Sequence, residues 1–201
     1  MKSLQIITSA IALAAMAMPA YAQEFTGPSV GVQGGWNKTD VRNPQSELGP
    51  LALEGSKDAF VGGAFIAYDY EVVPNVVIGA QADFSIGAND EIEYLTSVGS
   101  VTLDPKRSID LTARAGYVIL PGTLLYARGG YTNARVRTTM TVGGTTSSGS
   151  EDRDGWTVGG GVERYVWKNV SARVEYRYAD LSDGDGKFDR HQVLLGIGYR
   201  F

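Results

Sequence analysis

The chain has no cysteine and a single histidine, His191. The missing cysteine excludes disulfide bonds and thiolate metal sites together. The 18 lysine and arginine residues face 22 aspartate and glutamate residues, so the formal charge is −4 and there is no basic stripe. We therefore expect no nucleic-acid partner, and no motif in the sequence calls for a cofactor.

Long apolar runs are missing from the chain after its N-terminal segment. No later stretch approaches the ~18 consecutive apolar residues of a helical membrane span. A helical membrane protein is excluded, but a β one is not, because the signal of a membrane strand is weak and has to be counted across strands. The 201 residues are 43% hydrophobic and 20% charged, with 26 glycines, which is the composition of one folded domain.

The segment 1–22 has the form of a secretory signal peptide. Lys2 precedes an apolar run that ends at Pro19, and Ala20 and Ala22 occupy the small-residue positions of a cleavage site. The alternative is an uncleaved membrane anchor, but the run is shorter than the roughly 20 apolar residues that a spanning helix needs. We expect cleavage after Ala22, which gives a mature domain over 23–201.

Residues 170–178, VSARVEYRY, alternate between apolar and polar side chains, which indicates a β-strand with two different faces. Seven other segments follow the pattern, the first two less clearly: around 30–36, then 60–70, 76–86, 108–117, 125–132, 156–163 and 191–201. Short turns with Pro, Gly or Asn are expected at 71–75, 120–123 and 167–169, and long polar loops at about 37–57, 87–105, 137–153 and 180–188. This predicts an all-β fold, an eight-stranded antiparallel up-and-down transmembrane β-barrel.

The charges on the polar faces decide which face looks inward. A soluble lipocalin-type barrel would turn this face to water, and a solvated face needs no balance of charge. Here four acids and four bases are balanced, as expected for pairing across a narrow lumen, and the opposite faces carry aromatics toward the strand ends. An arginine facing lipid at mid-depth costs roughly 2–4 kcal/mol, so we place the charges inside. The predicted luminal salt-bridge network consists of Asp83, Asp110, Arg114, Arg128, Glu163, Arg173, Glu175 and Arg177.

Several short motifs carry a resemblance to a known family. They are GAQADF at 79–84, GGY at 129–131, GWTVG at 155–159 and GYRF at 198–201. With the signal peptide and the eight segments, they resemble the small outer-membrane surface-antigen barrels of alphaproteobacteria, a porin-type family related to the opacity-type and OmpA-like barrels. The resemblance implies the outer membrane of a Gram-negative bacterium, with its lipid and lipopolysaccharide, and a role in envelope integrity and host or environmental contact.

The C-terminal strand resembles the signal by which the barrel-assembly machinery recognises its clients. Its alternating apolar residues end in the terminal phenylalanine: Val193, Leu195, Ile197, Tyr199 and Phe201. The resemblance therefore implies that this machinery is a partner during assembly.

Catalytic chemistry is not expected. His191 falls on the outward face at the rim of the last strand, and position 193 is Val where the lipid A deacylase pattern has Ser. The acidic turn at 183–189 lacks the bidentate Glu of a Ca²⁺ loop. Asp110 and Glu163 could be an acid/base pair, but Arg114 and Arg128 share their predicted lumen, so salt bridges are expected instead.

Three functions remain, in this order. The first is a non-enzymatic structural and surface protein that displays its loops. The second is a narrow, porin-like channel for small solutes, because the lumen is polar. The third is a lipid A-modifying enzyme. The sequence identifies no extracellular ligand.

Overall fold

The computed structural model describes residues 25–42, 45–46, 49–50, 54–88, 92–96, 99–142, 145–182 and 187–201. Within these ranges every regular element is a strand, and no helix is suited to crossing a membrane. The expected cleavage site at Ala20 and Ala22, and most of the acidic turn at 183–189, lie outside the described residues.

Eleven strands follow one another along the chain: β1 (Gly27–Arg42), β2 (Gln45–Ser46), β3 (Gly49–Pro50), β4 (Glu54–Val73), β5 (Val76–Ala88), β6 (Ile92–Thr96), β7 (Gly99–Leu120), β8 (Thr123–Val142), β9 (Thr145–Trp167), β10 (Val170–Asp180) and β11 (Lys187–Arg200).

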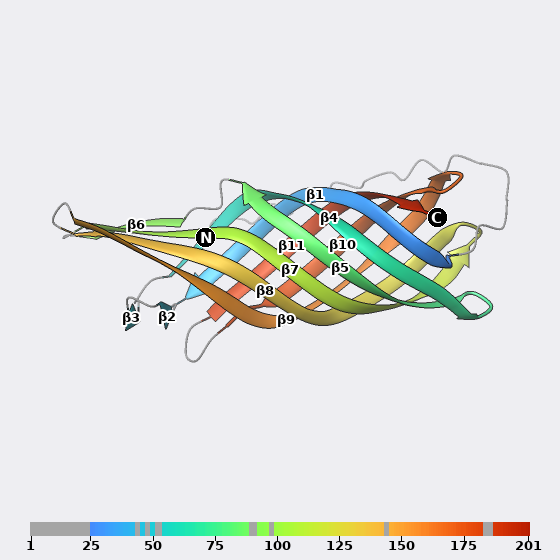
Figure 1. Cartoon of the computed structure of the whole chain (residues 1–201), viewed down its shortest axis with the longest axis horizontal. Coiled ribbons are helices and arrows are strands. Elements are labelled where there is room, and N and C mark those ends of the chain that lie inside the picture. The colour runs from blue at the N-terminus through green and yellow to red at the C-terminus, as the bar shows by residue number, and fades with distance from the viewer. Residues whose placement is uncertain are drawn as a thin grey trace, which may run out of the picture.

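Eight of these strands close into a cylinder (Figure 1). The main sheet runs in the order β5-β4-β1-β11-β10-β9-β8-β7-β6, and β5 also pairs with β7. This additional antiparallel pairing joins the two sides of the sheet, so that among its strands only the short β6 lies outside the ring, paired with β7. The short β2 and β3 pair with each other in a separate sheet. The predicted eight-stranded antiparallel barrel is confirmed.

The three short turns lie where the sequence predicts them. Each contains a residue with positive φ: Asn75 (69°), Gly122 (72°) and Lys168 (39°). Gly and Asn adopt this left-handed conformation most readily, which is why Pro74-Asn75 and Pro121-Gly122 form tight reversals there. All three turns therefore close one end of the cylinder.

The long connections at the other end are more ordered than predicted. The expected loop at 137–153 is largely strand, because β8 continues to Val142 and β9 begins at Thr145. Likewise β1 continues to Arg42, and the expected loop at 87–105 contains β6 and the start of β7. Polarity alone was a poor guide here, because Thr-rich segments such as 138–146 favour extended backbone as well as water. The result is a sheet of β6 to β9 that projects beyond the cylinder (Figure 1).

The barrel is inside out relative to a soluble protein. Along β11 the alternation is nearly strict: Leu195 and Ile197 are each 59% exposed, while Gln192 and Arg200 are buried. The same holds around the cylinder, with exposed Ile, Leu, Val and aromatic side chains outside and buried Arg, Asp, Glu, Gln, Ser and Thr inside. A glycine is needed where the interior is crowded: a Cβ on Gly31 would overlap the Phe65 ring.

Candidate functional site

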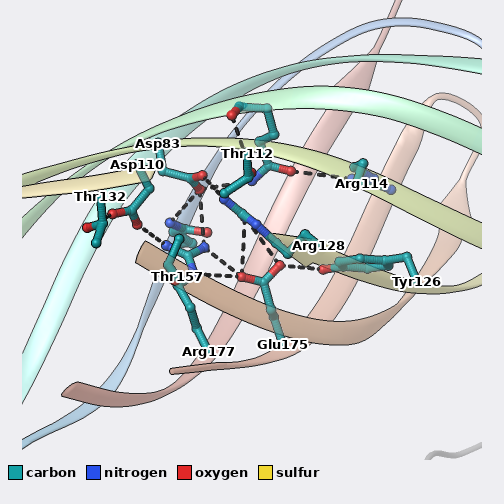
Figure 2. Close-up of polar contacts among 12 residues, drawn as sticks. Asp83, Asp110, Thr112, Arg114, Tyr126, Arg128, Thr132, Thr157, Glu175 and Arg177 are labelled. Atoms are coloured by element: carbon teal, nitrogen blue, oxygen red, sulfur yellow. Dashed lines mark hydrogen bonds and ion pairs between the residues drawn. The ribbon is translucent and has the colours of Figure 1, made fainter. Parts of the chain in front are cut away.

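The eight residues predicted for the lumen all point into the cylinder. None exposes more than 5% of its surface. They come from β5, β7, β8, β9 and β10, so strands distant in sequence contribute side chains to one polar interior (Figure 2).

Arg177 contacts three carboxylates. Its Nη1 is 2.6 Å from Asp110 Oδ2, and its Nη2 is 2.6 Å from Glu175 Oε1 and 3.3 Å from Asp83 Oδ1. Because β10 and β5 lie on opposite sides of the cylinder, the pair with Asp83 spans the lumen. This guanidinium uses its fork of donors to join three strands.

Arg128 on β8 joins two of the same carboxylates from another side. It pairs with Asp83 and lies 3.3 Å from Glu175 Oε1. The Tyr126 hydroxyl donates a hydrogen bond of 2.7 Å to Glu175 Oε2. Asp83 and Glu175 are therefore each held by more than one arginine.

A second cluster forms a closed ring of four charges. Arg114 lies 3.2 Å from Asp69 and 2.9 Å from Glu163. Arg200 lies 2.8 Å from Asp69 and 3.5 Å from Glu163. The predicted luminal network includes Arg114 and Glu163 but not Asp69 and Arg200, although the alternation Tyr68-Asp69-Tyr70 puts Asp69 on the inner face. Asp110 and Glu163 belong to different clusters, so they do not form an acid/base pair.

Amide side chains connect the two clusters, and one aromatic ring packs against Arg173. Gln81 Oε1 accepts hydrogen bonds from Arg173 (3.0 Å) and Arg114 (3.4 Å). Arg173 also donates to Gln33 Oε1 at 2.6 Å, and its guanidinium lies 3.6 Å from the centre of the Phe65 ring. Gln33 and Phe65 were not predicted, because neither residue type indicates a luminal position by itself.

A cluster of buried, mostly apolar residues lies toward each end of the lumen. At the turn end, Phe25 is fully buried and packs with Val77, Leu124 and Tyr126. We call this group the turn-end lid. At the loop end, a second cluster forms the loop-end lid, which consists of Val41, Ala134, Val136, Leu181 and Phe188. The charged network is thus enclosed between two apolar layers.

Because these charges are buried, their ion pairs affect the stability of the barrel strongly. Burying a charged group costs solvation free energy, and its ion pairs offset this cost only if every partner is present. Removing one partner typically costs roughly 3–5 kcal/mol. Eight strands leave an interior just wide enough for side chains. Packed arginines and carboxylates therefore fill this barrel and tie its strands together.

The outer surface carries the apolar residues of the C-terminal strand. Val193, Leu195, Ile197, Tyr199 and Phe201 all point outward and are 41–69% exposed. Their role as an assembly signal stays a prediction. Trp156, Tyr131 and Tyr176 are also outward and about half exposed, as at a membrane interface.

His191 lies on this outer surface, as predicted. Its Nδ1 is 2.8 Å from the Tyr176 hydroxyl, and its ring lies 5.1 Å from the Tyr178 ring. The Tyr178 hydroxyl in turn donates to Asp189 at 2.9 Å. Within the described part of the chain, no three His, Cys, Asp or Glu residues are arranged to hold a metal ion.

The family model of the outer membrane protein beta-barrel domain matches residues 8–201. A 22 kDa outer membrane protein of Rhizobium leguminosarum is 31% identical over 163 residues, covering 77% of this chain and 72% of the relative. A 31 kDa outer-membrane immunogenic protein of Brucella melitensis is 27% identical, covering 92% of this chain and 87% of the relative.

Solved structures share the fold. The attachment invasion locus protein Ail of Yersinia pestis aligns over 88% of this chain and 99% of its own, with a TM-score of 0.52 and 18% identity. Neisserial surface protein A aligns over 87% of this chain and 99% of its own, with a TM-score of 0.51 and 19% identity. A polar lumen, an apolar exterior and these relatives lead to one conclusion: the chain belongs to the outer membrane protein beta-barrel family and lies in the outer membrane of a Gram-negative bacterium.

Proposed function

We propose that this protein is a non-enzymatic structural barrel that supports the integrity of the outer membrane and presents its loop-end sheet to the host or the environment. The observation that carries the proposal is the enclosed lumen: ion pairs fill it and an apolar lid closes each end. Such an interior suits mechanical stability of the barrel better than passage of a solute.

A narrow channel is the second candidate, and the polar character of the lumen favours it. Planar-bilayer recording of the refolded protein separates the two functions. A sealed barrel gives no conductance steps, whereas a channel conducts, and Arg128→Ala should then raise its conductance because a luminal side chain is lost. Steady conductance of the unaltered protein would contradict the sealed barrel.

Surface display is the second part of the proposal. The sheet of β6 to β9 projects beyond the cylinder at the end opposite the short turns (Figure 1). A protease site inserted between Ser147 and Ser148, where the side chains are exposed, should be cut on intact cells. The same site inserted at Pro121-Gly122, in a turn at the other end, should be cut only after the outer membrane is broken.

The contribution to the envelope can be tested in cells. A strain that lacks the protein should become more sensitive to detergents and large antibiotics, and the unaltered gene should restore resistance. Mass spectrometry of lipid A from both strains tests the third candidate: unchanged lipid A supports a non-enzymatic role, and a lost modification would refute it. We further propose that lipopolysaccharide surrounds the outer surface and that the barrel-assembly machinery inserts the protein.

A further inference from the structure

A small polar cavity lies inside the barrel, next to the loop-end lid. Its volume is about 30 Å³. Residues from β1, β4, β5, β7, β8 and β11 line it, among them Asn37, Ser85, Ser108, Arg190 and Gln192. Phe188 of the loop-end lid also borders it, so the cavity separates the lid from the charged network.

Two buried amide oxygens in the cavity wall need hydrogen-bond donors. Asn37 is 4% exposed and Gln192 is 2% exposed. Among the described residues, none donates a hydrogen bond to Asn37 Oδ1 or to Gln192 Oε1, whereas Asn37 Nδ2 donates one to Thr39 Oγ1 at 3.2 Å. A buried acceptor without a donor is costly, so native proteins supply one from the chain or from an ordered water molecule.

The volume and the chemistry fit water. A water molecule needs roughly 10–15 Å³ of such space and two to four polar partners, so the cavity has room for about two. The amide oxygens accept, while the Ser85 and Ser108 hydroxyls can donate or accept. Arg190 adds donors to the wall, and its Nη2 is held 3.5 Å from Asp110 Oδ1.

We propose that this cavity is a binding site for ordered water, in which about two water molecules donate hydrogen bonds to Asn37 and Gln192. Arg190 then links the bound water to Asp110 of the charged network. The network is hydrated on its loop-end side, whereas the turn-end lid keeps its other side dry. The two ends of the lumen therefore differ in their hydration.

A crystal structure at a resolution that reveals ordered solvent tests the site directly. We expect solvent density within hydrogen-bond distance of Asn37 Oδ1 and Gln192 Oε1, and a dry cavity would overturn the proposal. Because Arg107 and Arg190 also line the cavity, a crystal soaked in bromide should be measured as well. An anomalous bromide peak there would assign an anion site and reject water.

Stability of the Asn37→Leu variant gives an independent readout. If water is bound, the substitution removes the amide oxygen to which a water molecule donates a hydrogen bond. The barrel should then unfold at a lower urea concentration. In a dry cavity, the same change removes one unsatisfied oxygen and only the hydrogen bond to Thr39, so the urea midpoint should fall no further than in a variant that loses one amide hydrogen bond, which would overturn the proposal. Asn133→Leu is the matched control, since it also loses one amide hydrogen bond (to Asp154, 2.7 Å) but lies on the outer surface, and it should leave the cavity solvent unchanged.

Discussion

Arg177 on β10 reaches Asp110 on β7 with a contact of 2.6 Å between Nη1 and Oδ2, although 67 residues separate the two in the chain. Only the closed cylinder brings them together, because β8 and β9 lie between their strands in the sheet. This pair can therefore form only when the strands are rolled into the cylinder.

Replacing Arg177 by Met should destabilise the barrel strongly. The change keeps most of the side-chain volume but takes one cation from Asp83, Asp110 and Glu175, and breaking a buried pair costs roughly 3–5 kcal/mol. Urea unfolding of the refolded protein, followed by the mobility of unboiled samples on a gel, measures the loss. Arg135→Met is the control, because the Arg135–Asp152 pair is exposed at 3.9 Å and such pairs contribute about 0–1 kcal/mol. Equal losses in the two variants would contradict a network that stabilises the barrel.

The sequence predicts which residues of this network face the lumen, because successive side chains of a strand point to opposite faces. Alternation alone assigns Arg173, Glu175 and Arg177 to the inner face, and the same parity assigns Asp69 and Arg200 once their flanking aromatics are turned to lipid. It does not identify the partners, because these depend on the register and tilt with which the strands meet around the cylinder.

The position of Phe25 and the projecting sheet cannot be predicted from the alternation of side chains. Phe25 precedes the first strand and carries no periodic signal, so its place in the turn-end lid follows only from contacts such as the 4.9 Å between its ring and that of Tyr165. For the projecting sheet the sequence predicts loops, because Thr- and Ser-rich stretches such as 138–148 lack the apolar face by which membrane strands are recognised.

A methyl group at Gly31 should be poorly tolerated. A Cβ there would overlap the ring of Phe65 and the carbonyl oxygen of Ile197. Since the guanidinium of Arg173 lies on that ring, the displacement would reach the charged network, and overpacking of this kind typically costs roughly 1–3 kcal/mol. The urea midpoint of Gly31→Ala should fall, while Gly62→Ala on β4 should change little, because nothing lies within 4 Å of its added methyl group. A larger loss at Gly62 would show that strand flexibility, not crowding, dominates.

Truncating Phe25 should weaken the turn-end lid without opening the lumen. The residue is fully buried, and a buried Phe→Ala change costs roughly 3–5 kcal/mol. Arg114 and Arg200 with their carboxylates still fill the barrel beside the lid, so Phe25→Ala should unfold at lower urea yet stay silent in planar bilayers. Phe84→Ala, on the exposed outer face, is the control and should lose less. If Phe25→Ala conducts while Phe84→Ala does not, the lid and not the network is the seal.

The terminal Phe201 provides the sharpest test of the predicted assembly signal. Phe201 and Phe60 are both outward-facing aromatics, 69% and 72% exposed, so replacing either by Ser removes a similar apolar surface from the lipid. If the alternating C-terminal residues are read during assembly, Phe201→Ser should reduce the amount of folded barrel in the outer membrane far more than Phe60→Ser. The measurement is the heat-modifiable fraction in outer-membrane preparations. Refolding of both purified variants in detergent should be similar, because that reaction needs no recognition, and a refolding defect confined to Phe201→Ser would place its effect in barrel stability instead.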